Sequence, residues 1–295
     1  MPAAERLGPV EFVAARFVPV ALFCLLWFIL LKRERREARR ILAEHGWAVV
    51  GLGLLNVWGY NLAFAAGHHR VPAGTGSLFT VLNPVLTFVL AVLAGHERPR
   101  WTKAAGIALA FGGLYTVVVY GSGRAVEAAY LRDALLLLGA PVSWSLYTVF
   151  SKPLVHRYRP LTLNFLVLGI ASFPALGFAL LSRPFHQKVA AWSLERHLWA
   201  WFLALACTLL GFWLWYEALQ RVPATTAAAF VFLNAPLTVA FDWLWFDHVP
   251  QPAWVLGCAL VLGGVWLSTR DLASTSSETQ APDPRADTWV GPYER

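Results

Sequence analysis

The chain has 295 residues, of which 58% are hydrophobic and 14% are charged, and its mean hydropathy is +0.54. Soluble globular proteins carry about a quarter charged residues, so this composition excludes an ordinary soluble fold. The net charge is +7, but the basic residues gather between apolar runs, which is typical of membrane topology rather than of a nucleic-acid-binding surface. The three cysteines lie far apart inside apolar runs, which argues against a disulfide framework and against a metal site.

Nine apolar runs are candidates for transmembrane helices, each of which needs about 20 residues. They cover roughly residues 10–31, 47–66, 73–95, 103–120, 131–151, 162–182, 198–219, 224–246 and 252–268. We therefore predict an all-α polytopic membrane protein. The first run contains Glu11 and Arg16 and has no small-residue cleavage site, so we expect a retained helix rather than a cleavable signal peptide. Residues 272–295 are polar and are predicted to form a disordered tail.

The orientation follows from the loops after the first, third and fifth runs, which all fall on one side of the membrane. These loops hold 12 of the 24 lysines and arginines: Lys32, Arg33, Arg35, Arg36, Arg39 and Arg40, then Arg98, Arg100 and Lys103, then Lys152, Arg157 and Arg159. Because Lys and Arg favour the cytoplasmic side, we expect these loops and the C-terminus in the cytoplasm and the N-terminus outside. The expected location is the inner (plasma) membrane of a bacterium.

A duplication organises the chain. Residues 70–113 align with residues 221–264 without a gap, with about 17 of 44 positions identical. Arg70 falls in an outer loop and Arg221 in an inner loop, so the two copies are predicted to be inverted. The copies span residues 10–120, with four helices, and 131–268, with five, which indicates a five-helix unit whose first helix is missing from the first copy. Transporters are commonly built this way, with the site between the copies.

Asn83 and Asn234 occupy equivalent positions in the two copies, about 15 Å from the start of their helices and therefore near the middle of a core roughly 30 Å thick. Pro84 and Pro236 follow them and are expected to free a backbone carbonyl and bend each helix. Two amides facing each other across a pseudo-twofold axis would form a polar substrate site. The alternative is that the asparagines only bridge helices.

A second group of candidates lies on two polar stripes. Ser143, Trp144 and Tyr147 share one side of the fifth run, where aromatic and hydroxyl groups could cradle an apolar or aromatic metabolite. Asn56 and Tyr60, with Asn61 nearby, form a similar stripe on the second run. Ordinary helix packing is the alternative interpretation for both stripes.

Charged residues inside membrane spans are functional candidates by default. Arg16 lies about 9 Å from the outer end of its helix and is the best candidate for an electrostatic role toward an anionic substrate group. Glu217 and Asp242 lie close to helix ends and are candidates for proton coupling. All three are placed where the side chain could extend toward the membrane surface instead.

Small residues recur at matching places, with Ala108 and Gly112 in the fourth run and Ala259 and Gly263 in the ninth. Small residues four apart allow close helix packing, so we expect a seam either between the repeats or between two protomers of a homodimer. No nucleotide-binding or metalloprotease motif is present, so we predict neither an enzyme nor a bound cofactor or metal.

Several short motifs occur in a fixed order along the chain, at residues 11–17, 82–84, 96–97, 132–133, 143–148, 151–152 and 216–224. Their order and spacing resemble those of the EamA-type transporters of the drug/metabolite transporter superfamily. The resemblance covers about residues 8–268 and implies ten helices in two inverted halves and export of small metabolites. The chain departs from it by starting where the second helix would stand.

These observations favour a secondary transporter that exports a small organic metabolite, such as an amino acid or a drug-like compound, by alternating access. Its partners would be the small-molecule substrate and the lipid bilayer, with no nucleic acid. A membrane scaffold or sensor that transports nothing, or a truncated transporter that has lost activity, is the alternative, favoured by the missing helix.

Overall fold

The structure is a computed structural model that describes residues 7–68, 82–121, 131–246 and 252–270. In these ranges all regular secondary structure is helical, and each predicted span contains helix in its described part, which confirms the all-α fold class. The first copy comprises α1 (Pro9–Leu30), α2 (Lys32–Gly53), η2 (Leu54–Tyr60), α3 (Asn61–His68), α5 (Asn83–Leu93) and α6 (Trp101–Gly121). The second comprises α7 (Leu131–Arg157), α8 (Pro160–Leu181), α9 (Arg183–Ala190), α10 (Leu194–Phe202), η4 (Leu203–Leu210), α11 (Gly211–Arg221), α12 (Ala224–Ala229), η5 (Phe230–Leu233), α13 (Asn234–Phe246) and α14 (Pro252–Thr269).

The basic segment after α1 differs from the predicted loop. The chain breaks only at Leu31, whose backbone is extended, and α2 begins at Lys32. Lys, Arg, Glu and Ala are good helix formers, and here they continue directly into the next span with a kink at His45. Beyond the kink, the end of α2 continues through η2 and α3 as one long helical rod, matched in the second copy by the rod over Leu194–Arg221.

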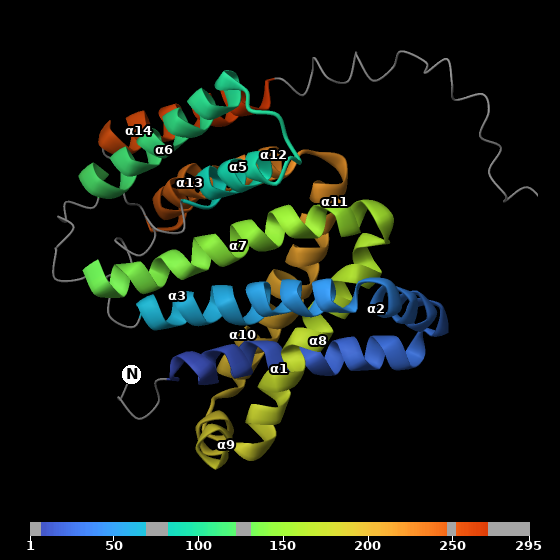
Figure 1. Ribbon diagram of the computed structural model, residues 1–295. Helices are drawn as coiled ribbons and strands as arrows, with labels where there is room; N and C mark the ends of the chain where they lie inside the picture. The colour runs from blue at the N-terminus through green and yellow to red at the C-terminus, as the bar shows by residue number, and fades with distance from the viewer. Residues whose placement is uncertain (1–6, 69–81, 122–130, 247–251, 271–295) are drawn as a thin grey trace, which may run out of the picture.

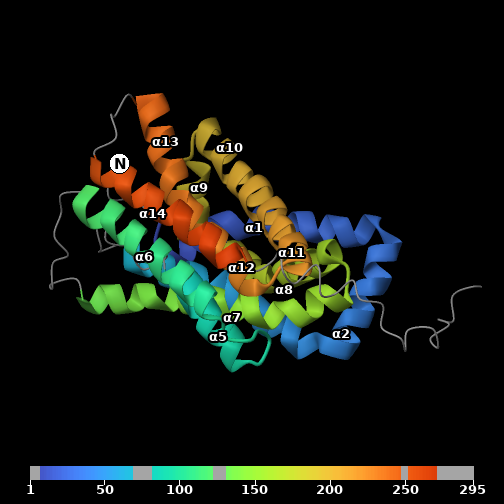
Figure 2. The ribbon, with the colours of Figure 1, turned by 90° about the horizontal axis from the view of Figure 1, so that it is seen from above.

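Equivalent helices of the two copies pack against each other. The repeat makes α8 the counterpart of α1 and α14 that of α6, and both of these pairs are in contact. The counterpart of α5 is α13, while α5 itself packs against α12. Figures 1 and 2 show α6 and α14 side by side, while α3 lies against both α1 and α7 (Figure 1). The helix α7 has no counterpart among the described residues of the first copy, and it packs against α3, η2, α5 and α11.

The contact between α6 and α14 reveals the inverted symmetry directly. A Cβ atom on Gly264 would lie 2.4 Å from the Ala110 nitrogen and 2.6 Å from the Gly106 oxygen, and a Cβ on Gly113 would lie 2.6 Å from the Gly257 oxygen. Gly106 and Gly257 are equivalent in the repeat, as are Gly113 and Gly264. Rising residue numbers in α6 therefore meet falling numbers in α14, so equivalent helices are antiparallel, as inversion requires.

The predicted register of this seam between the repeats was wrong. Ala108, Gly112 and Ala259 are exposed, and a Cβ on Gly112 would meet nothing within 4 Å. The helix turns these positions away from the crossing, which instead uses residues spaced by seven in each helix. The interpretation of the outward-facing small residues as a contact between protomers stays a prediction.

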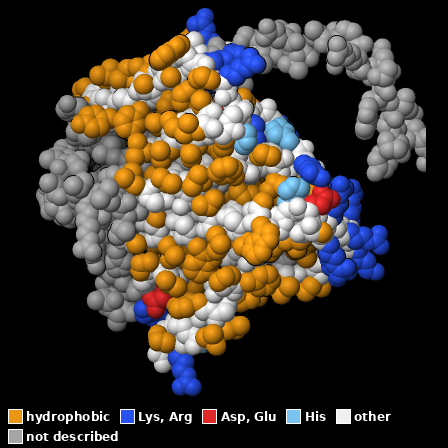
Figure 3. Space-filling view, viewed as in Figure 1, with side chains coloured by type: hydrophobic (Ala, Val, Ile, Leu, Met, Phe, Trp, Pro, Cys, Tyr) orange, Lys and Arg blue, Asp and Glu red, His pale blue; other side chains and the backbone are white. Residues whose placement is uncertain are grey.

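Apolar side chains cover much of the face of the protein that Figure 3 shows. Lys and Arg gather at the edge of this face where α2 begins and α7 ends. Among the described residues, five helices are long and apolar enough to cross a membrane. Trp47 and Trp101, each 91% exposed, stand at the ends of spans, where aromatic residues anchor proteins at the membrane surface.

The glycine seam can be tested by adding a single methyl group. We expect Gly264→Ala to lower the free energy of unfolding by about 1–3 kcal/mol, because the new Cβ would overlap the α6 backbone. Gly112→Ala is the matched control and should be neutral or slightly stabilising, since alanine is the better helix former. Thermal unfolding followed by tryptophan fluorescence would compare them, and equal stability of the two variants would contradict the seam.

Candidate functional site

Arg16 is held inside the bundle by two neutral groups. Its Nε donates a hydrogen bond of 2.9 Å to Thr208 Oγ1, and its Nη1 donates one of 3.2 Å to Asn61 Oδ1. Its guanidinium carbon lies 5.6 Å from the centre of the Phe17 ring. Within the described ranges, no carboxylate lies within ion-pair distance of Arg16. The side chain therefore points into the protein instead of reaching the membrane surface, and its charge has no counter-ion there.

Both partners of Arg16 are fixed by π-helical turns. The segments η2 and η4 occupy matching places in the two copies and interrupt the two long rods. Asn61 Nδ2 donates to the Asn56 carbonyl at 3.0 Å, and Thr208 Oγ1 donates to the Leu203 carbonyl at 2.8 Å. In each bond the side chain donates to the backbone carbonyl five residues earlier, within the π-helical turn. This bond orients the side chain, and its oxygen, Asn61 Oδ1 or Thr208 Oγ1, accepts a hydrogen bond from Arg16. Such turns occur often at functional sites.

An aromatic cluster begins beside Arg16 and centres on Trp144. Tyr60 interacts electrostatically with Arg16, and its ring centre lies 5.5 Å from that of Trp144. The Trp144 ring also contacts the rings of three further residues at centre distances of 5.3–5.7 Å: Tyr147, Phe212 and Trp215. Tyr147 stacks on Tyr216 with ring centres 5.7 Å apart. A cation, three tyrosines and a tryptophan thus form a continuous path between the copies.

Polar atoms of this cluster are buried without a directed hydrogen bond to any described residue. They include both amide atoms of Asn56, the hydroxyls of Tyr147 and Tyr216, and the indole nitrogens of Trp144 and Trp215. Asn56 and Tyr216 are polar neighbours of the Tyr147 hydroxyl, but their geometry does not form hydrogen bonds. Buried polar groups are normally paired, and leaving one unpaired costs about 1–3 kcal/mol. This concentration of unpaired donors and acceptors is typical of a site that receives a polar ligand or water.

The structure places the other candidate residues differently. Ser143 packs against Gly59, where an added Cβ would lie 2.6 Å from its hydroxyl oxygen. Asn83 begins α5, is 5% exposed, and accepts a hydrogen bond from Ser145 of α7 on its carbonyl. Asn234 begins α13 at the equivalent place, after the 3-10 turn η5, but is exposed. The two asparagines therefore start equivalent helices in different surroundings.

The acidic candidates lie elsewhere. Glu217 accepts hydrogen bonds from Trp213 at 3.3 Å and Arg221 at 3.0 Å near the end of α11. Asp242 belongs to α13, but its side chain lies outside the described residues, as do Arg70 and the segment 272–295. Sequence reasoning missed Thr208, Phe212, Trp215 and Tyr216, since only packing brings α11 and η4 to the candidates on α1, η2 and α7. An isolated threonine inside the apolar segment Leu203–Leu210 was the one available signal.

The two copies are joined at the end of the bundle that carries most of the basic residues, called the basic end below. Glu97, in the turn between α5 and α6, forms an ion pair with Lys103 at 2.9 Å. It also accepts hydrogen bonds from the backbone nitrogen, at 3.1 Å, and the hydroxyl of Thr225 in α12. Nearby, Lys152 of α7 donates to the Val222 carbonyl at 2.5 Å. These contacts close the basic end around the α12 N-terminus.

Comparison with known proteins decides the family. The model of the EamA-like transporter family matches residues 2–119 and again residues 131–270. The chain belongs to this family. A relative from Streptantibioticus cattleyicolor named "Probable terminal-alkyne amino-acid exporter" is 28% identical over 239 residues, covering 79% of this chain and 76% of the relative. A "Probable amino-acid metabolite efflux pump" from Escherichia coli is 27% identical over 234 residues, covering 74% and 77%.

A solved crystal structure shares the fold. It aligns with a TM-score of 0.71 and 18% identity, covering 93% of this chain and 91% of that chain. The family match and the apolar helices identify the protein as an integral membrane transporter. The names of the two relatives above, a probable exporter and a probable efflux pump, point in the same direction.

The contacts of Glu97 with Lys103 and Thr225 predict that the free energy of unfolding depends on pH. Burial raises the pKa of this carboxyl group, but the hydrogen bonds from Thr225 and the ion pair with Lys103 outweigh burial and hold the pKa below 4.5. The stabilisation is therefore complete above pH 4.5 and is lost as the pH falls through the lower folded-state pKa. We expect Glu97→Gln to cost about 1–3 kcal/mol near neutral pH and little in strong acid.

Thermal unfolding of the wild type and of Glu97→Gln at several pH values would measure this difference. Glu195→Gln is the matched control, because Glu195 is an exposed residue of α10 whose only described bond is from Trp199 at 3.4 Å. A Glu97→Gln penalty that persists unchanged in acid would show that the charge of Glu97 contributes nothing.

Proposed function

We propose that this protein exports a small amino-acid-type metabolite that carries a carboxylate and an apolar side chain. The carboxylate would pair with Arg16, and the apolar part would lie against Trp144 and its aromatic neighbours. The observation that carries the proposal is Arg16: a cation between the two copies, bonded only to neutral groups within the described chain. A partly buried charge inside an apolar bundle favours an anionic partner, and a transported anion would supply one.

The aromatic cluster supports the apolar half of the substrate. Aromatic rings give large apolar contact area, while the indole and hydroxyl groups bind polar atoms. Tyr60 connects Arg16 to Trp144, so one short ligand could contact both the cation and the rings. The unpaired groups of Asn56, Tyr147 and Tyr216 would bind the remaining polar atoms, such as an ammonium group or its water. The unpaired Oδ1 of Asn83, on the neighbouring α5, belongs to the same proposal.

The names of two relatives agree with this substrate class, since one is named for terminal-alkyne amino acids and another for amino-acid metabolites. We further propose that the basic end and the C-terminus face the cytoplasm of a bacterium, as the distribution of Lys and Arg favours. The inverted copies would then rock around the Arg16 site by alternating access. Opening toward the cytoplasm would require the Glu97–Thr225 contacts to break. Proton coupling through Glu217 or Asp242 stays a prediction.

Transport by purified protein in liposomes would test the role of Arg16. We expect exchange of labelled apolar L-amino acids, including one with a terminal alkyne, and a kcat/KM about 10- to 100-fold lower in Arg16→Gln, because a charge-assisted hydrogen bond is lost. The loss should be specific to the acid: the wild type should discriminate strongly against the matching carboxamide, and Arg16→Gln should not.

Two variants separate this role from folding. Arg183→Gln removes an exposed arginine of α9 and should transport normally. Thr208→Val keeps the charge of Arg16 but removes one of its hydrogen bonds, so we expect a smaller loss and retained preference for the acid. Equal discrimination between acid and carboxamide in the wild type and in folded Arg16→Gln would overturn the assignment.

A further inference from the structure

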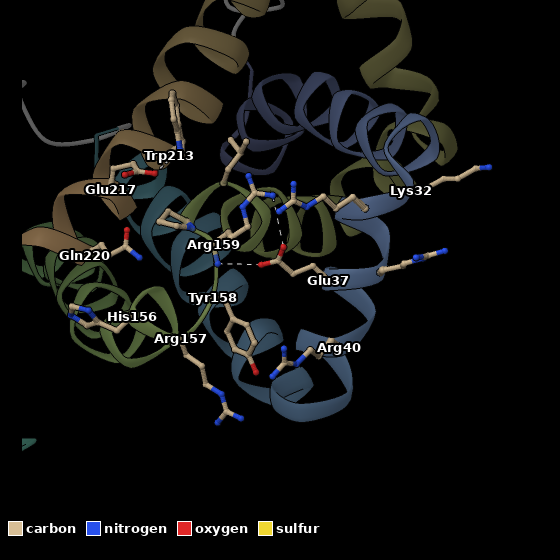
Figure 4. A pocket seen from close by; sticks show the side chains of 14 residues that line it. Lys32, Glu37, Arg40, His156, Arg157, Tyr158, Arg159, Trp213, Glu217 and Gln220 are labelled. Atoms are coloured by element: carbon tan, nitrogen blue, oxygen red, sulfur yellow. Dashed lines mark hydrogen bonds and ion pairs between the residues drawn. The ribbon is translucent and has the colours of Figure 1, made fainter. Parts of the chain in front are cut away.

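A cleft of about 970 Å³ opens at the basic end, separate from the Arg16 site. Its walls come from the start of α2, the junction between α7 and α8, and the end of α11. Figure 4 shows Glu37 and Arg159 near its centre, Trp213, Glu217 and Gln220 on the α11 side, and Lys32 extending outward at the rim. Six of its lining residues are lysine or arginine and two are glutamate: Lys32, Arg33, Arg36, Arg40, Arg157 and Arg159, with Glu37 and Glu217.

Nearby carboxylates neutralise only half of these cations. Glu44 pairs with Arg40 at 2.8 Å and with Arg157 at 2.7 Å. Arg159 pairs with Glu34 at 2.8 Å and lies 4.0 Å from Glu37. Glu217 is paired with Arg221 outside the cleft. Lys32, Arg33 and Arg36 therefore remain without a carboxylate partner in the described part of the chain.

One helix N-terminus adds positive potential to the same cleft. Lys32 and Arg33 form the start of α2, whose preceding residue provides no side-chain cap. The helix dipole favours an anion at such a position. The start of α8 also lines the cleft, but carboxylates already bind there: Glu37 accepts a hydrogen bond from the Arg159 backbone nitrogen at 3.2 Å, and Glu34 accepts one from the Thr162 hydroxyl. The topology of the chain explains why basic residues lie at this end, but not why unpaired ones face a concave surface at a helix start.

The place of the cleft indicates which anion would reach it. The cations begin immediately after the outward-facing apolar residues Ile29 and Leu30, which are 57% and 66% exposed. In a membrane, those residues face lipid chains, so Lys32, Arg33 and Arg36 stand at the level of the lipid headgroups. Leu161 and Trp213 provide apolar lining beside the charges. A phosphate attached to acyl chains matches this combination better than a free soluble ion.

We propose that this cleft binds the phosphate group of an anionic phospholipid, with Arg33 and Arg36 as its principal ligands. The site is distinct from the proposed substrate site, because its binding residues are on α2 and Arg16 is on α1. It requires no transported substrate, so its test does not depend on the proposed function.

The test uses the full chain, purified in a neutral detergent and supplied with phosphatidylglycerol, phosphatidylcholine or inorganic phosphate. We expect a saturable rise in the unfolding temperature with phosphatidylglycerol and little response to the other two. In Arg33→Gln/Arg36→Gln the apparent affinity should fall roughly 10- to 30-fold, because each surface cation contributes about a four- to sixfold effect.

The matched control is Arg35→Gln/Arg39→Gln, which removes the same charge from the same helix at positions outside the cleft lining. It should bind phosphatidylglycerol as the wild type does. Equal weakening in both double variants would indicate general charge attraction and would overturn the site. A response to inorganic phosphate equal to that of the lipid would overturn the lipid assignment, and so would the absence of any saturable response.

Discussion

The constraint on which this structure depends is that polar groups inside an apolar bundle must find their partners within the protein. Arg16 shows how the chain meets it. The residue lies on α1 and donates to Thr208 in η4 and to Asn61 at the start of α3, and π-helical turns orient both partners. One cation thereby joins three helical segments from both copies. Each of the two π-helical interruptions orients one hydrogen-bond partner of Arg16.

The aromatic cluster extends the same principle to the contact between the copies. Trp144 and Tyr147 stand on α7 and meet Tyr60 from η2 and three rings from α11. The helix α7 therefore provides side chains that contact both long rods. The unpaired polar atoms of this cluster come from η2 of the first copy and from α7 and α11 of the second.

The sequence predicted what depends on local pattern. Apolar runs of span length predicted the helical fold, and the repeat together with the uneven distribution of arginine and lysine predicted the inversion. Arg16 was a candidate because it is a charged residue inside an apolar run. The predictions that failed concern which face of a helix packs against its neighbour. The small residues that repeat most visibly, Ala108 and Gly112, face outward, and identity between copies carries no information on that point. Thr208 and the α11 aromatics were missed because only packing brings them to Arg16 and Trp144.

The seam between α6 and α14 constrains how the chain can change over evolutionary time. At an ordinary helix contact, a larger residue on one side can be accommodated by a smaller one opposite, so second-site changes restore the fit. Here the atom nearest to each added Cβ belongs to the backbone: the Ala110 nitrogen for Gly264, the Ser268 nitrogen for Gly106 and the Gly257 oxygen for Gly113. These backbone atoms stay in place whichever side chain stands opposite, so a smaller residue there cannot remove them. Lineages of this protein would therefore have no compensating route around a substitution here, even though the contact involves no charge and no hydrogen-bonding side chain.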